Sequence, residues 1–140
     1  MSCNLIIPPL LLSVLLLSLP SRAGMVVYTD HVHPPSGVTG DTRVVWLDAP
    51  EQLLQSLFGT LTSDPGEAER RAQAVLHSAG WEKKQTELAQ AYQGLLQAWS
   101  LGLQKYPAVV SDDRYVVYGT ADVVVAEGLF HSHRTREGQR

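Results

Sequence analysis

The clearest pattern in the chain lies at residues 106–119, which read YPAVVSDDRYVVYG. Apolar residues at 108–110 and β-rich residues at 115–118 flank Asp112 and Asp113. Because Asp tolerates the positive φ angles of tight turns, this segment predicts a β-hairpin. Both faces of its second run are apolar or aromatic, as in a strand that is covered on both sides, so we expect helices to pack over it.

Two shorter β-rich runs precede the hairpin, at residues 25–29 and 43–47. The sequence between them, at 30–42, is rich in proline and glycine and predicts a loop. This loop just reaches the length that a crossover between parallel strands requires. The two runs therefore predict a parallel strand pair at the start of the domain.

Four further stretches carry apolar residues at helical spacing. The expected helices begin near Pro50, Pro65, Trp81 and Thr120 and end at Gly59, Gly80, Leu103 and Phe130. Asp48 is expected to cap the first helix, and Thr120 the last. In the last helix, a set of apolar residues is expected to face inward: Val123, Val124, Ala126, Leu129 and Phe130. From about residue 131 we expect a polar, frayed tail.

The aromatic residues have two interpretations. Trp46 and Trp99 are expected in the core, because the third helix carries one broad apolar face that includes Trp99. An aromatic surface could instead bind another protein, since aromatic residues dominate interface hot spots.

Residues 1–23 stand apart from this pattern. An apolar run at 5–19 is followed by small residues at Ser21 and Ala23, which predicts a signal peptide cleaved after Ala23. The alternative is an uncleaved anchor, since no lysine or arginine precedes the apolar run. Cys3 is the one cysteine of the chain, so residues 24–140 have no disulfide and no catalytic thiol. The formal net charge of −3 and the lack of a basic block argue against direct nucleic-acid binding.

The expected order of elements is therefore strand, strand, three helices, hairpin and helix. It predicts an α/β fold in one domain at 24–140: a mixed sheet of about four strands with helices on both faces.

The candidate functional loop follows the first strand and contains Asp30, His31, His33 and Pro34. Residues i and i+2 share a face of an extended segment, so His31 and His33 could bind zinc or copper together with Asp30. The other interpretation is a polar turn in a proline-rich loop.

Two other pairs of polar residues have simpler interpretations. Asp112 and Asp113 form the hairpin turn, and the His131–His133 pair belongs to the solvated tail.

The order of elements resembles the thioredoxin fold, in which a proline precedes a hairpin strand. The resemblance implies a cis bond between Tyr106 and Pro107. Where thioredoxins have their reactive dithiol, this chain has Asp30 to Pro34 and no cysteine, so their redox chemistry does not carry over.

Four segments together resemble a family of small exported proteins that bacterial integrating conjugative elements encode beside type IV secretion genes: 26–35, 43–53, 89–110 and 112–123. A more distant likeness is to the pilin-assembly proteins of F-type conjugation systems. These resemblances imply a periplasmic role in DNA transfer between cells, and they assign no activity to particular residues.

We therefore expect a non-enzymatic periplasmic component of a conjugative type IV secretion system. It would support pilus or channel assembly by contacting other secretion-system or pilus-assembly proteins. We expect no cofactor and no stable membrane span after leader cleavage. The alternative is a periplasmic metal-binding or enzymatic thioredoxin-like protein that uses His31 and His33.

Overall fold

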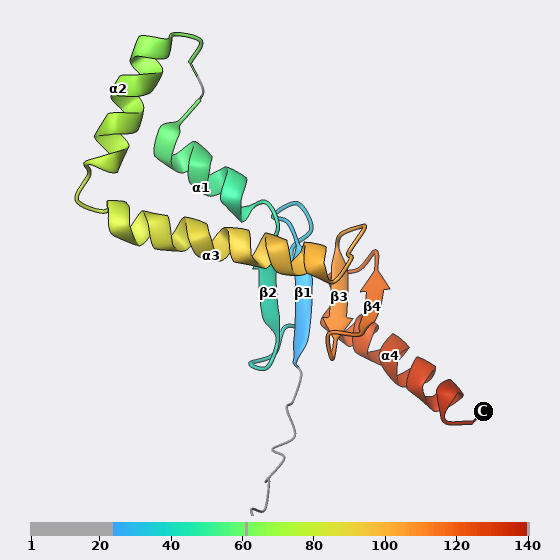
Figure 1. Ribbon diagram of the computed structural model, residues 1–140. Helices are drawn as coiled ribbons and strands as arrows, with labels where there is room; N and C mark the ends of the chain where they lie inside the picture. The colour runs from blue at the N-terminus through green and yellow to red at the C-terminus, as the bar shows by residue number, and fades with distance from the viewer. Residues whose placement is uncertain (1–23, 61, 140) are drawn as a thin grey trace, which may run out of the picture.

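The computed structural model describes residues 24–60 and 62–139, and the expected signal peptide at 1–23 lies outside the described residues. The described chain forms an α/β domain whose elements follow one another as shown in Figure 1. In order these are β1 (Met25–Thr29), β2 (Arg43–Trp46), α1 (Ala49–Phe58), α2 (Pro65–Leu76), α3 (Trp81–Ser100), β3 (Ala108–Ser111), β4 (Tyr115–Tyr118) and α4 (Val123–Glu137).

The four strands form one mixed sheet in the order β2-β1-β3-β4. β1 pairs in parallel with β2, and Val27 lies opposite Val44. On its other side β1 pairs antiparallel with β3, where Val27 lies opposite Val109, and β3 pairs antiparallel with β4. The predicted mixed sheet, parallel strand pair and hairpin are confirmed.

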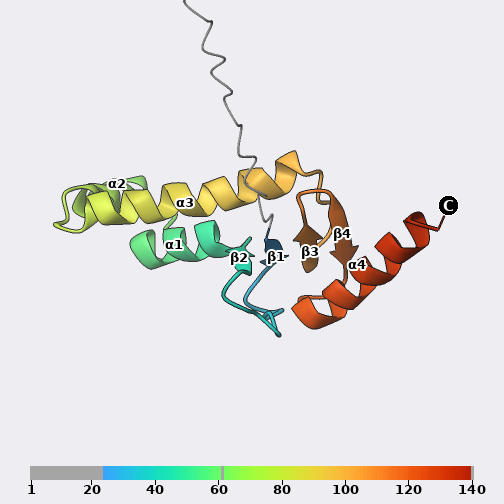
Figure 2. The ribbon, with the colours of Figure 1, turned by 90° about the horizontal axis from the view of Figure 1, so that it is seen from below.

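Helices cover both faces of this sheet, as predicted (Figure 2). α3 covers one face and α4 the other, while α1 packs on α3 and α2 packs on α1. Side chains alternate between the two faces along each strand. The buried residues on the α3 side are Val26, Tyr28, Val45, Ala98 and Val110. Those on the α4 side are Val27, Val109, Val123, Ala126 and Phe130.

Local chemistry explains two of the predicted boundaries. Asp112 and Asp113 have φ angles of 57° and 49°, which makes them the turn of the hairpin. The Asp64 carboxylate caps α2, because its Oδ1 accepts hydrogen bonds from the backbone N–H groups of Gly66 at 2.8 Å and Glu67 at 3.3 Å.

The last helix differs from its prediction. Its N-cap is Asp122, whose carboxylate accepts a hydrogen bond from the Val125 N–H at 3.0 Å, and Thr120 lies outside the helix. α4 continues to Glu137, so the expected frayed tail forms its exposed last turns. Val124 and Leu129 point to solvent, with exposed fractions of 64% and 51%. The buried positions of α4 are 123, 126 and 130, which form one narrow face of the helix. Positions 124 and 129 lie outside that face.

Neighbouring positions on α4 provide a test of this packing. Phe130 is 4% exposed and Leu129 is 51% exposed. Phe130→Ala should lower the free energy of unfolding by about 3–5 kcal/mol, because it leaves a cavity in the α4-side core. Leu129→Ala, the control, should lower it by less than about 1 kcal/mol. Urea denaturation measures both, and equal losses would contradict the orientation of α4.

Candidate functional site

The loop that follows β1 is held by a tight turn. The backbone N–H of His33 donates to the Asp30 carbonyl at 3.2 Å and to the Asp30 Oδ1 at 2.9 Å. The same Oδ1 lies 2.6 Å from the His33 Nδ1. Thr29 also donates its hydroxyl hydrogen to the His33 carbonyl. The loop therefore presents the His33 imidazole in one orientation, with its Nδ1 against a carboxylate.

His31 is anchored to the start of α1. Its Nδ1 lies 2.9 Å from both carboxylate oxygens of Asp48, and its backbone N–H donates to the Asp48 Oδ2 at 3.2 Å. Gln52 donates to the Asp48 Oδ2 at 2.9 Å. The imidazole also stacks on Trp46, with ring centroids 4.3 Å apart and planes 18° from parallel. This network links the loop, β2 and α1.

The predicted position of Asp48 at the start of α1 is confirmed, but the predicted capping contact of its side chain is wrong. Asp48 is the N-cap residue of α1, but its side chain makes no capping hydrogen bond. The carboxylate turns toward His31, which lies 17 positions earlier in the chain. Because this partner is distant in sequence, the local pattern Asp-Ala-Pro could not indicate it.

His33 connects the loop to the segment before β3. Its ring lies edge-on to the Tyr106 ring, with centroids 6.5 Å apart. The bond between Tyr106 and Pro107 is cis, as the resemblance implied. The predicted loop and the predicted proline motif thus meet at one end of the sheet, while Pro34 is exposed on the same loop.

Two carboxyl groups in this site have lowered pKa values. Partial burial alone would raise the pKa of Asp48, but the hydrogen bonds from His31 outweigh burial and hold that pKa below its usual value. Burial likewise raises the pKa of Asp30, and the hydrogen bonds from His33 outweigh it. Both groups therefore stay ionised at neutral pH.

The geometry gives the metal-site prediction no support. Within residues 24–60 and 62–139, no group of three or more His, Cys, Asp or Glu side chains is placed to hold a metal ion. Each imidazole instead directs its Nδ1 to its own carboxylate, His31 to Asp48 and His33 to Asp30. His131 and His133 lie on α4, where neighbours two apart point in different directions, and His133 lies 3.7 Å from Glu137.

An apolar groove begins beside these carboxylates. One cavity of about 580 Å³ is lined by Asp30, Asp48, Trp99, Leu103 and Tyr106, among others. A second, of about 820 Å³, lies between α1 and α3. The two cavities share Leu47, Glu51 and Leu95 in their linings, so they lie next to each other, and we call them together the α1–α3 groove.

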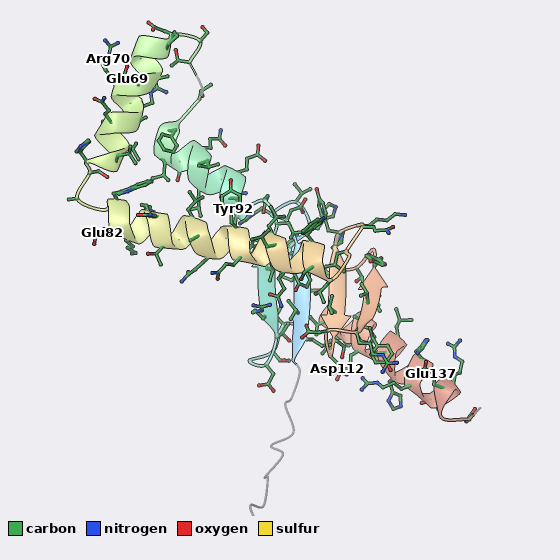
Figure 3. The ribbon with its side chains drawn as sticks, viewed as in Figure 1. Glu69, Arg70, Glu82, Tyr92, Asp112 and Glu137 are labelled. Atoms are coloured by element: carbon green, nitrogen blue, oxygen red, sulfur yellow. The ribbon has the colours of Figure 1, made fainter. Side chains whose placement is uncertain are left out.

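One wall of the groove belongs to a set of exposed apolar side chains on α3: Tyr92, Leu95, Leu96 and Trp99, called here the α3 stripe. Figure 3 shows Tyr92 where α3 faces α1. Trp99 is 79% exposed and Leu96 is 60% exposed, so the prediction that Trp99 is in the core was wrong. The sheet and α1 together cover only part of the apolar face of α3. The rest of that face is exposed to solvent.

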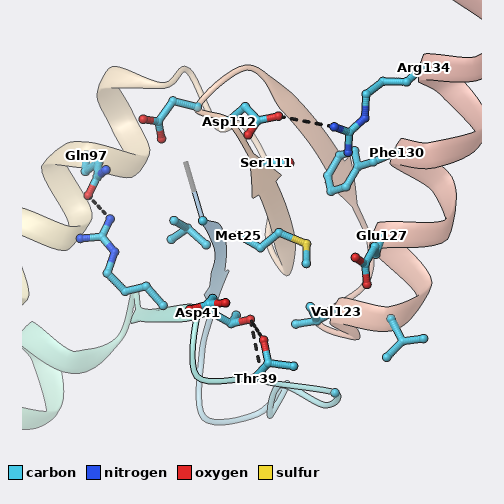
Figure 4. A pocket seen from close by; sticks show the side chains of 17 residues that line it. Met25, Thr39, Asp41, Gln97, Ser111, Asp112, Val123, Glu127, Phe130 and Arg134 are labelled. Carbon is cyan, nitrogen blue, oxygen red and sulfur yellow. Dashed lines mark hydrogen bonds and ion pairs between the residues drawn. The ribbon is translucent and has the colours of Figure 1, made fainter. Parts of the chain in front are cut away.

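Another cavity, of about 1020 Å³, lies at the opposite end of the sheet (Figure 4). It is lined by Met25 at the start of β1, whereas the histidine loop follows the end of that strand. An ion pair of 3.8 Å between Asp112 and Arg134 crosses its rim. None of the predicted site residues lines this cavity, so it is separate from the candidate site.

The His31–Asp48 contact predicts a specific pH dependence. Because the folded-state pKa of Asp48 is lowered, its ionised form stabilises the fold. That stability is fully present above the unfolded pKa of about 3.9 and is lost as pH falls through the folded pKa. Asp48→Asn should therefore be less stable than the wild type at pH 6, and the difference should shrink as pH falls below about 3.9.

Urea denaturation at pH 6 and at about pH 3 measures this difference. Glu51→Gln is the matched control, since Glu51 lies on the same helix and has no ion-pair partner within the described chain. An equal effect of both substitutions at both pH values would contradict the role given to Asp48.

The chain matches the model of a family described as "Protein of unknown function (DUF1525)" over residues 22–136. Neither the curated proteins nor the solved structures contain a significant match. The family match spans both strands that carry the histidine site and the helix that carries the α3 stripe. Because the family model covers most of the length of this chain, the chain belongs to the DUF1525 family.

Proposed function

We propose that this protein is a non-enzymatic periplasmic component of a conjugative type IV secretion system of an integrating conjugative element. In this role it supports pilus or channel assembly by binding other proteins of the apparatus. The observation that carries the binding role is the α3 stripe, which leaves Trp99 79% exposed beside an apolar groove. The conjugative context comes from the sequence resemblance.

The composition of the α3 stripe supports a protein-binding role. Tryptophan and tyrosine are enriched among the residues that dominate interface energies, and each aromatic side chain can bury about 150–250 Å². Trp99 and Tyr92 lie seven residues apart on α3, about two helical turns, with Leu95 and Leu96 between them. Contiguous exposed apolar surface of this kind marks interaction sites in soluble proteins.

We also propose that the domain is thioredoxin-like. Its sheet order β2-β1-β3-β4, in which β3 and β4 form an antiparallel hairpin, supports this assignment. The loop after β1 holds Asp30, His31 and His33, and residues 24–140 contain no cysteine. A dithiol mechanism therefore has no residues to use in this loop, which favours a binding role.

The periplasmic location is part of the proposal and is supported by the leader-like sequence of residues 1–23. As for the described residues, none of their helices has both the length and the apolar character that crossing a membrane requires.

The two aspartate–histidine pairs favour a second candidate, an enzymatic protein that uses His31 and His33. A carboxylate on Nδ1 orients an imidazole so that Nε2 can accept a proton, as in acid–base catalysis. His31 and His33 are about half exposed, at 47% and 49% of their side-chain surface, so substrate could reach them.

Transfer frequency from a donor strain tests the proposed function. Deleting the gene should abolish transfer, and the wild-type gene should restore it. The double variant Leu96→Ser/Trp99→Ser should restore transfer poorly, at least about tenfold below the wild type, because losing one hot spot costs about 2 kcal/mol or more of binding free energy. Val124→Ser, at an equally exposed position on α4, is the control and should restore it fully.

Two results would argue against the proposal. Normal transfer after deletion would contradict the conjugative role, and full restoration by Leu96→Ser/Trp99→Ser at normal protein levels would contradict the binding surface. A third variant distinguishes the second candidate function from the first. If His31→Ala/His33→Ala folds, reaches the periplasm and fails to restore transfer, the histidine pair is the functional site.

A further inference from the structure

We infer that the α1–α3 groove binds an amphipathic helix of a partner protein, with basic residues beside the apolar face of that helix. This inference rests on the proposed binding role and names the chemistry of the partner. Three properties of the groove carry it: the spacing of its apolar residues, the backbone of its walls and the charge of its rim.

The spacing fits a helix. The α3 stripe recurs at positions 92, 95, 96 and 99, which places its four side chains in one line along α3. This line is about 10 Å long, because each helical residue rises about 1.5 Å. The α1–α3 groove extends it at both ends, toward Phe58 in one direction and Tyr106 in the other. Two to three turns of a partner helix could bury an apolar face there.

The backbone of the groove walls favours a helix over an extended strand. Between α1 and α3 both walls are helical, and the N–H and C=O groups of helix interiors are already paired within each helix. An extended peptide in this part of the groove would bury backbone groups with no partners. A helix satisfies its own backbone and needs only side-chain contacts, as in other helix-in-groove complexes.

The charged residues at one end of the groove, called here its rim, indicate that the partner carries positive charge. Three carboxylates line the end of the groove near the histidine loop, those of Asp30, Asp48 and Glu51, against one ammonium group, that of Lys105. The lowered pKa values of Asp30 and Asp48 keep both groups ionised at neutral pH. Lysine or arginine flanking the apolar face of the helix would complement this rim, whereas glutamate would be repelled.

Three synthetic peptides of about 18 residues test the inference by titration calorimetry with the purified protein. The first places leucines at helical spacing and lysines beside them, the second replaces every lysine with glutamate, and the third scrambles the order of the first. The lysine peptide should bind at least about tenfold more tightly than either of the others, and added salt should reduce its preference over the glutamate peptide.

Protein variants locate the site. Trp99→Ser should weaken binding of the lysine peptide at least about tenfold, since it removes the most exposed aromatic side chain of the stripe. Glu51→Gln should weaken it by about threefold, in keeping with the small contribution of an exposed charge pair. Val124→Ser on α4 is the control and should leave the affinity unchanged.

Several outcomes would overturn the inference. Equal binding of the lysine and scrambled peptides would show that the groove does not require an amphipathic helix. Equal binding of the lysine peptide by the wild type and Trp99→Ser would show that the peptide binds outside the α3 stripe. Self-association that Trp99→Ser abolishes, seen by sedimentation velocity, would assign the groove to a second copy of the chain. Tighter binding of a carrier-fused segment 5–19 than of the lysine peptide would assign it to the N-terminal segment of this chain.

The inference and the proposed function fail differently. If the stripe variants impair DNA transfer but no peptide binds, the surface binds a partner of another kind and only the inference fails. If the lysine peptide binds but the stripe variants transfer DNA normally, the groove binds helices and the proposed function fails.

Discussion

The antiparallel pairing of β1 with β3 is the contact on which the rest of the structure depends. Tyr28 lies opposite Ala108, so the residues that follow β1 are brought beside those that precede β3. The chain separates these segments by four other elements, yet this pairing places His33 against Tyr106. Both strands are buried on both faces, and so the position of the loop is set by the core.

The packing of α3 and α1 explains why this end of the sheet has both a charged loop and an apolar groove. α3 covers one face of the sheet with a few residues of its last turns, among them the buried Ala98, and leaves its other residues for α1 and solvent. Because α1 begins directly after β2, the Asp48 carboxylate at its start reaches His31 in the loop after β1. The charged loop and the apolar groove are therefore adjacent because of the topology.

Local signals in the sequence predicted most of the fold. The strand at 25–29, the Asp112–Asp113 turn and the start of α2 at Pro65 each depend on neighbouring residues, and each was predicted. The candidate loop was also found from the sequence, because His31 and His33 stand two residues apart beside Asp30, where the thioredoxin resemblance places an active site. The partner of Asp48 and the exposure of Trp99 could not be predicted, since both depend on which elements pack together. A helix with a broad apolar face has the same pattern whether that face is fully covered or partly open.

In the role proposed above, the α3 stripe contacts another protein of the secretion apparatus. The most direct measurement places a photo-crosslinking amino acid at position 99 in donor cells and identifies the products by mass spectrometry, with position 124 on α4 as the reference. We expect a product with an identified secretion-system subunit from position 99 and none from position 124. Products from position 99 that contain only this chain, or equal yields of the same product from both positions, would contradict it.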